Sequence, residues 1–203
     1  ALCSRYHCTM VFSTATQPEF KSIQGVSWKP IEIVPEYPMM YKKLTRTQVE
    51  WRMKKQIPLE KIAWEMEEVE NVCAIVNLRR HAVKLFEFLK NDHCDREEIF
   101  FLTTDLCPKH RSEVIRKIKE RQKAGLPCKV ISTQCIEAGV DLDFHVLYRA
   151  LAPLEAIIQA AGRCNRSGRF ETGKVVVFEP EVEGNLYPPD KWYQNAAVVV
   201  KEI

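Results

Sequence analysis

The chain has 203 residues, of which 46% are hydrophobic and 28% charged, and its formal net charge at pH 7 is +3. This length suits one large domain or one domain with a fragment, and the composition is ordinary for a soluble globular protein. No apolar run approaches the roughly 20 residues that cross a bilayer, so we expect no membrane partner.

The first part of the chain predicts a short strand and then an irregular stretch. Residues 8–13 form an apolar run typical of a buried strand, and a polar loop follows. Residues 20–41 are irregular and contain prolines, which favours a linker. Apolar and polar residues then alternate over 49–54, which predicts a half-buried strand. Pro58 opens a predicted helix through about residue 68, with four apolar side chains on one face: Leu59, Ile62, Ala63 and Met66.

Strands and helices then alternate regularly along the chain. The predicted strands are continuous apolar runs at residues 72–76, 99–102, 128–132, 145–148 and 174–178. The predicted helices cover residues 79–90, 108–124 and 154–161. The first of these helices turns five apolar side chains inward: Ala82, Val83, Leu85, Phe86 and Leu89. Continuous apolar strands are buried on both faces, so we predict an α/β fold, a three-layer α/β/α sandwich around a mostly parallel sheet.

Polar loops follow three of these strands, after Val76, Leu102 and Ile131. Ligands of such sheets bind at the carboxyl ends of the strands, where these loops are expected to lie. Residues 108–129 carry eight Lys or Arg side chains and two Glu side chains. A solvated helix face and a surface that tracks phosphates explain this basic stretch equally well.

Two segments carry the clearest chemistry, residues 132–141 and 159–166. The first is Ser-Thr-Gln-Cys-Ile-Glu-Ala-Gly-Val-Asp, and the second is Gln-Ala-Ala-Gly-Arg-Cys-Asn-Arg. Arg163 and Arg166 are three residues apart, which predicts that they share one helix face. Two guanidinium groups so placed suit the terminal phosphate of a nucleotide.

The eight cysteines are predicted to be reduced thiols. There is no Cys-x-x-Cys pair, and several cysteines fall inside predicted strands or inside the two motifs. We therefore expect no metal site made of cysteines and a cytoplasmic location.

The motifs resemble those of a known enzyme family. Residues 13–16, 132–141 and 159–166 resemble motifs III, V and VI of superfamily 2 helicases. The amino-acid sequences of four segments resemble those of the CRISPR-associated helicase-nuclease of type I interference systems: residues 14–18, 106–111, 137–141 and 159–166. The resemblance covers most of the chain from residue 10 to about 180, and it implies RecA-like domains.

The resemblance also implies a division of the chain. Residues 1–19 would end a first RecA-like domain, 20–45 would be a linker, 46–180 a second RecA-like helicase domain and 181–203 a C-terminal extension. The sequence has no Gly-x-x-x-x-Gly-Lys-[Ser/Thr] loop, no Asp-Glu-x-His box and no His-Asp nuclease signature. We therefore expect the C-terminal helicase portion of a larger protein, or a separately encoded subunit.

The roles implied by the resemblance fall into three groups. Arg163 and Arg166 would complete an ATP site, Gln159 would sense the nucleotide, and Gly139, Asp141 and Gly162 would lie beside it. The implied contacts to nucleic acid are Thr133, Thr103, Thr104, Arg79 and Arg111. Thr14 and Thr16 would couple the two sites. ATP and Mg²⁺ would be bound mainly by the missing domain.

The implied partners are single-stranded DNA, a guide-RNA surveillance complex, the first RecA-like domain and a His-Asp nuclease domain. Three alternatives remain open. The chain could belong to another superfamily 2 enzyme, such as an RNA helicase or a DNA-repair translocase. It could also be a non-catalytic RecA-like module that binds nucleic acid or protein, or a piece that docks on a larger complex.

Overall fold

The computed structural model describes residues 2–12, 24–25, 31–36, 39–40, 42, 44–91, 97–136, 140–181, 187 and 191–201. The chain divides into two units, residues 1–43 and 44–203. The functional motifs that the structure describes all lie in the second unit.

In the first unit, the described residues begin with a short helix, α1 (Leu2–Tyr6). The strand expected at residues 8–13 is wrong over the described part, since residues 8–12 adopt no regular structure. Met10, Val11 and Phe12 are exposed. A buried strand needs neighbours that pair with its backbone and cover its side chains, and an apolar run alone does not supply them. The expected linker and domain boundaries stay predictions.

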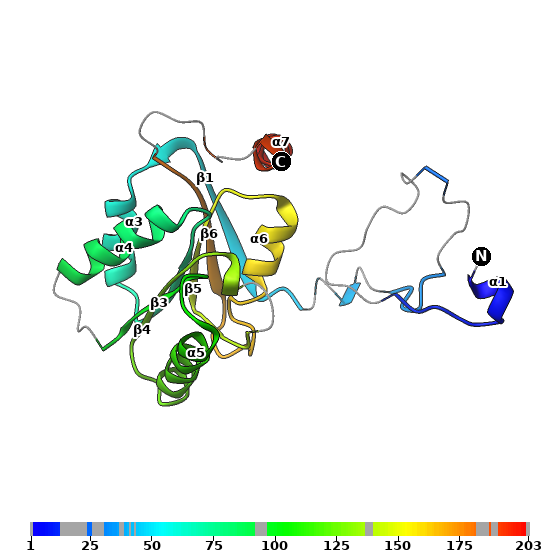
Figure 1. The fold of residues 1–203 in the computed structure, drawn as a ribbon, viewed down its shortest axis with the longest axis horizontal. Helices are drawn as coiled ribbons and strands as arrows, with labels where there is room; N and C mark the ends of the chain where they lie inside the picture. The colour runs from blue at the N-terminus through cyan, green and yellow to red at the C-terminus, as the bar shows by residue number, and fades with distance from the viewer. Residues whose placement is uncertain are drawn as a thin grey trace. The chain divides into compact units, whose positions relative to one another are not determined.

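The second unit is built on one six-stranded sheet (Figure 1). Its strands are β1 (Thr47–Ile57), β2 (Asn71–Ile75), β3 (Ile99–Leu102), β4 (Cys128–Ser132), β5 (Val146–Ala150) and β6 (Gly173–Pro180). Their order across the sheet is β1-β6-β5-β2-β4-β3, and every described pair is parallel. All the strands therefore end at one edge of the sheet, the carboxyl edge, and begin at the opposite amino edge.

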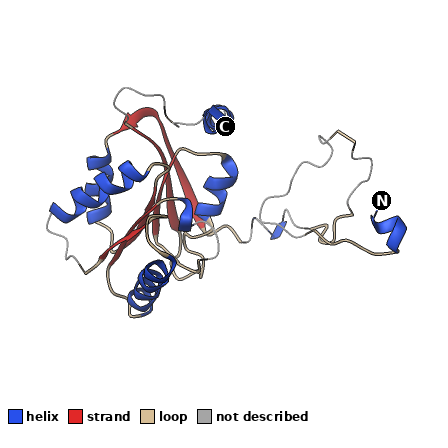
Figure 2. Ribbon diagram, viewed as in Figure 1, coloured by secondary structure: helices blue, strands red, loops and turns tan. Residues whose placement is uncertain are grey.

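Helices cover both faces of this sheet (Figure 2). Helices α3 (Leu59–Glu67) and α4 (Arg79–Asn91) pack together on one face. Helices α5 (Pro108–Lys123) and α6 (Leu154–Ala161) cover the other face, and α7 (Lys191–Lys201) contacts α6. Right-handed crossovers between parallel strands dictate this distribution, because the strand order reverses direction between β3 and β4. The predicted three-layer RecA-like architecture is confirmed.

The core confirms most of the predicted inward faces. The apolar face predicted for α3 is buried, and β4 and β5 are buried along their whole length. In α4, Ala82, Leu85 and Leu89 are fully buried, but Val83 is 42% exposed. Val83 was therefore wrongly assigned to the inner face, since it lies to one side of the stripe formed by the other three. Within the described residues, no helix combines the length and the apolar character needed to cross a bilayer.

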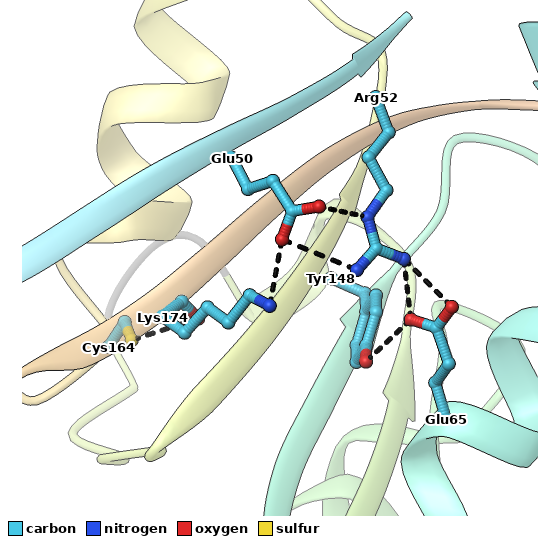
Figure 3. A network of polar contacts seen from close by, with 6 residues as sticks. All are labelled: Glu50, Arg52, Glu65, Tyr148, Cys164 and Lys174. Carbon is cyan, nitrogen blue, oxygen red and sulfur yellow. Dashed lines mark hydrogen bonds and ion pairs between the residues drawn. The ribbon is translucent and has the colours of Figure 1, made fainter.

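The alternation predicted for strand β1 holds at Met53, which packs against the core, but not at its two preceding apolar residues. Val49 and Trp51 are each 41% exposed, whereas Arg52 is half-buried. Arg52 makes two hydrogen bonds to Glu65 of α3, at 2.8 and 2.6 Å, and another to Glu50 at 2.6 Å (Figure 3). Arg52 of β1 therefore points toward α3, because Glu65 on that helix supplies an oppositely charged partner.

This network extends to the adjacent strand β6 and to β5, the next strand in the sheet (Figure 3). Lys174 of β6 pairs with Glu50 at 2.8 Å, and the Tyr148 hydroxyl of β5 donates to Glu65 at 3.1 Å. The hydrogen bonds from Arg52 and Lys174 lower the pKa of Glu50 to about 2. Burial and the nearby Glu65 raise the pKa of Tyr148. The network therefore holds the edge strand β1 to the sheet and to α3 by charge as well as by apolar contact.

Candidate functional site

The predicted site residues divide between the two edges of the sheet. Thr103 and Thr133 follow β3 and β4, so they lie at the carboxyl edge. Asp141 precedes β5, and Arg163 and Arg166 follow α6, which runs back toward the starts of the strands. These three residues lie together at the amino edge. The fold therefore separates the residues assigned to nucleotide from those assigned to nucleic acid.

The two motif arginines lie on a turn, which corrects the expectation that they share a helix face. Helix α6 ends at Ala161, and Gly162 closes it with a φ of −63°. Asn165, between the arginines, has a φ of +48°. The segment is held by strand-like bonds to Phe144, whose N–H donates to the Arg163 carbonyl at 2.9 Å and whose carbonyl accepts from the Asn165 N–H at 2.8 Å. The left-handed backbone of Asn165 is incompatible with a helix that continues from Arg163 to Arg166, so the two arginines do not share a helix face.

The Arg166 side chain pairs with a carboxylate, and the charges of Arg166 and Asp141 influence Arg163. Arg166 Nη1 lies 3.2 Å from Asp141 Oδ1 in an ion pair that is largely exposed. Burial, and then the positive charge of Arg166, lower the pKa of Arg163, while Asp141 opposes this shift. Two guanidinium groups that repel one another beside one acid form a site that an additional anion would stabilise.

Asn165 fastens the same segment through its side chain. This residue is 1% exposed. Its amide nitrogen donates to the Phe170 carbonyl at 2.8 Å and to the Arg46 carbonyl at 3.1 Å, and its amide oxygen accepts from the Phe170 N–H at 3.1 Å. Arg46 also donates to the Arg166 carbonyl at 2.7 Å. The loop that carries the arginines is therefore built into the fold.

The other residues predicted to serve the nucleotide lie on or next to α6, or outside the described part of the chain. Gln159 is exposed on α6, in a shallow hollow lined by Pro153, Glu155, Ala156, Trp192 and Tyr193. Gly162 has a φ that any residue adopts, and an added Cβ would meet the Gln159 carbonyl at an ordinary 3.4 Å. Gly139, Thr14 and Thr16 lie outside the described residues.

At the carboxyl edge, two of the predicted threonines are buried. Thr103 is 0% exposed, and its hydroxyl accepts from the Asp105 N–H at 3.4 Å. Thr133 is 3% exposed, with its hydroxyl 3.8 Å from the Cys135 sulfur. Thr104 is exposed. The hydroxyl of Thr104 is therefore the one of the three that the described residues leave open to solvent.

The two arginines predicted at this edge fix the loop after β3. Arg79, at the start of α4, pairs with the exposed Asp105. Arg111 of α5 donates to the Leu106 carbonyl at 3.2 Å. Its Nε is buried, and the described residues provide no hydrogen-bond acceptor for it. Both side chains thus lie beside the loop between β3 and α5.

Sequence reasoning missed a buried polar group at the same edge. Arg149 of β5 is 0% exposed and donates to the Asn77 side chain at 2.7 Å. Asn77 in turn donates to the Tyr187 hydroxyl at 2.6 Å, and the His81 ring stacks on Tyr187. The signal available was an arginine inside an otherwise apolar strand. Among the described residues, no group of three or more His, Cys, Asp or Glu side chains could hold a metal ion.

The parallel sheet, the glycine-aspartate segment before β5 and the arginine turn after α6 define a RecA-like helicase domain. A family model described as the C-terminal part of the CRISPR-associated nuclease/helicase Cas3 matches residues 68–169. The chain belongs to this family.

Relatives and solved structures agree with this assignment. The chain is 48% identical over 76 residues to the CRISPR-associated nuclease/helicase Cas3 of Haloferax volcanii, covering 33% of this chain and 8% of that relative. It is 32% identical over 113 residues to the protein of the same name from Methanothermobacter thermautotrophicus, covering 54% and 13%. A crystal structure of T. fusca Cas3 with AMPPNP superposes with a TM-score of 0.59 at 19% identity, over 75% of this chain and 20% of that one. The matches therefore span a small part of each relative.

Proposed function

We propose that this chain is the second RecA-like domain of an ATP-dependent DNA translocase and supplies its arginine fingers. The observation that carries the proposal is the pair Arg163 and Arg166 on one turn, where Asp143 accepts the Arg166 backbone N–H and Asp141 pairs with the Arg166 guanidinium. Burial and then the charge of Arg166 lower the pKa of Arg163, and an anion such as a phosphate between the two guanidinium groups would offset both effects. An arginine positioned in this way stabilises the charge on the transferring phosphoryl oxygens.

The remaining nucleotide-side residues would support this role. Gln159 would orient the attacking water, Gly139 would allow the backbone turn, and Gly162 would let the nucleotide approach. Asp141 would turn toward the ribose or a magnesium-bound water. The Asp141–Arg166 pair is exposed, and exposed pairs contribute only about 0–1 kcal/mol, so a phosphate can displace the carboxylate at little cost. ATP and Mg²⁺ would be held mainly by another RecA-like domain, which brings the phosphate-binding loop.

The carboxyl edge would contact single-stranded DNA. We assign phosphate contacts to the side chains of Thr103, Thr104, Thr133, Arg79 and Arg111, and coupling of this edge to hydrolysis to Thr14 and Thr16. The buried hydroxyls of Thr103 and Thr133 would act once the neighbouring loop opens, whereas Thr104 is already exposed. Contacts to phosphates carry no base information, which suits movement along any sequence.

The partners follow from this assignment. A structure of a CRISPR RNA-guided surveillance complex, pre-nicking, contains a chain of this fold, with a TM-score of 0.57 at 18% identity. We propose that the present chain also works with such a complex in the cytoplasm, in CRISPR antiviral defence. A His-Asp nuclease domain on the same or another polypeptide would cut the DNA. The chain alone would have neither ATPase nor nuclease activity, because it lacks the phosphate-binding loop and the nuclease motif.

Reconstitution tests the proposal. The chain is mixed with a matching RecA-like domain that carries the phosphate-binding loop, and ATP hydrolysis is measured with and without single-stranded DNA. We expect DNA-stimulated turnover that falls by about 10³-fold in both Arg163→Ala and Arg166→Ala. Arg169→Ala is the matched control, because Arg169 is an exposed arginine in the same loop outside the motif.

Two results would count against the proposal. Hydrolysis by the isolated chain that Arg166→Ala abolishes would show a complete site within this unit. Full turnover in both arginine variants would leave the chain as a binding module with an inherited motif.

A further inference from the structure

The Asp143 side chain is bonded to the backbone of the arginine turn. Its Oδ1 accepts the Arg166 N–H at 2.7 Å, and its Oδ2 accepts the Ser167 N–H at 3.0 Å. Both carboxylate oxygens are therefore used on successive backbone groups. Bonds from N–H donors to a charged acceptor are shorter and stronger than neutral ones, so this contact fixes where the Arg166 side chain begins.

Asp143 differs in this respect from Asp141, two residues earlier. Asp141 contacts only the guanidinium end of Arg166, and both groups are largely exposed. Asp143 is half-buried and contacts the backbone. The first carboxylate can exchange with a ligand anion without disturbing the turn, whereas loss of the second removes an acceptor from two N–H groups.

The backbone of Asp143 is in turn held by Gln122, in the last turn of α5. The Gln122 amide nitrogen donates to the Asp143 carbonyl at 2.7 Å, and its oxygen accepts the Asp143 N–H at 3.4 Å. Asn71, the first residue of β2, also donates to that carbonyl at 3.3 Å and accepts from Gln122 at 3.3 Å. A single side chain that bonds to both backbone groups of a residue fixes its position relative to the helix.

Helix α5 connects the two edges of the sheet. It begins at Pro108, just after the loop that follows β3 at the carboxyl edge, and Arg111 in its first turn holds that loop through the Leu106 carbonyl. Its last turn reaches the amino edge at Gln122. A helix of 16 residues is a rigid body about 24 Å long. Displacement of its first turn is therefore transmitted to Asp143.

We propose that Asp143 is the positioning residue of the arginine turn, and that Gln122 ties it to α5 so that this helix links the nucleic-acid edge to Arg166. The expected effect on ATP hydrolysis rests on the proposed function, whereas the hydrogen bonds of Asp143 and Gln122 do not depend on it. It adds two residues to which the sequence motifs assigned no role.

The first experiment measures amide hydrogen exchange on the isolated chain. We expect Asp143→Ala to lower the protection of the Arg166 and Ser167 amides by about tenfold, and Asp143→Asn, which keeps one good acceptor, to lower it less. Asp141→Asn is the matched control and should leave both amides protected as in the wild type. Unchanged protection in Asp143→Ala, in a variant whose circular dichroism shows it to be folded, overturns the positioning role.

The second experiment uses the reconstituted ATPase. Asp143→Asn should lower kcat by about 10- to 100-fold while the KM for ATP stays within about twofold, because the arginines act in the transition state. Gln122→Ala should lower the ratio of DNA-stimulated to basal turnover by about fivefold or more, whereas Lys123→Ala, at the exposed neighbouring position, should not.

The outcomes separate the two proposals. An unchanged kcat in Asp143→Asn alongside a loss of turnover in Arg166→Ala overturns the inference and leaves the proposed function standing. An unchanged DNA stimulation ratio in Gln122→Ala overturns the link through α5. If Arg166→Ala itself keeps full turnover, the proposed function fails, and the amide measurement still decides whether Asp143 holds the turn.

Discussion

The Arg166 guanidinium is paired with the Asp141 carboxylate at 3.2 Å, although 25 residues of chain separate them and each remains largely exposed. The pairing arises because Phe144 and the arginine turn share backbone bonds at the amino edge of the sheet. The pair therefore marks where two motifs distant in sequence converge. It also leaves the Arg166 guanidinium exposed beside a carboxylate that an incoming anion would have to displace.

Replacing Asp141 by Asn is expected to change the free energy of unfolding by no more than about 0.5 kcal/mol, because exposed ion pairs contribute little. Removal of the competing carboxylate should also let the isolated chain bind inorganic pyrophosphate up to about fivefold more tightly. Urea unfolding and calorimetric titration measure these two quantities. Weaker pyrophosphate binding in the variant would mean that Asp141 orders the site and does not compete with the anion.

Gly173→Ala is expected to destabilise the chain by about 1–3 kcal/mol. An added Cβ would lie 2.7 Å from both the Asn165 Cβ and the Cys164 sulfur, which are fixed parts of the arginine turn. Gly162→Ala is the matched comparison, and its unfolding free energy should change by less than about 0.5 kcal/mol because that position has an ordinary helical φ and an added Cβ makes contacts no shorter than 3.4 Å. Denaturant melts compare the two. If Gly162→Ala is stable but loses ATPase, Gly162 serves the approach of the ligand.

Stability should fall with acidification through the titration of His81. Burial, followed by the charges of Arg80 and Lys84, lowers the pKa of this imidazole to about 4. Its usual value is about 6.5, so the unfolded chain takes up the proton first and stability decreases as the pH falls from about 6.5 through 4. The loss amounts to at most about 3.5 kcal/mol, at about 1.4 kcal/mol for each pKa unit. Urea unfolding midpoints at several pH values, in the wild type and in His81→Gln, measure this loss of stability. If stability depends on pH equally in both proteins, His81 is not the cause.

Arg52→Ala is expected to cost about 1–3 kcal/mol of stability, since the half-buried guanidinium bonds to both Glu65 and Glu50. Arg116→Ala offers a matched arginine–glutamate pair on α5, but both partners are more than half exposed, so its cost should stay below about 0.5 kcal/mol. Thermal melts at low and high salt compare the variants. Equal costs would show that the β1 network contributes no more than an ordinary surface pair.

The sequence predicted the α/β class and most of the elements, because their signals are local. The run at 128–132 and the helix at 154–161 match β4 and α6 in the structure. Burial on both faces leaves an uninterrupted apolar run, and a helix leaves its 3.6-residue period. The same reasoning misplaced residues 8–12, since a strand also needs partners that no local pattern supplies.

The sequence by itself also singled out the paired arginines, the acid at Asp141 and the order of the motifs, whose roles in chemistry stay predictions. Tertiary structure decided how these groups are held. It placed Arg163 and Arg166 on a turn with Asn165 at positive φ. It turned Arg52 inward toward Glu65 and brought Asp143 and Gln122 to the arginine segment. Each of these contacts joins residues more than ten positions apart or depends on such a contact, so it exists only once the chain has folded and the sheet has set which segments become neighbours.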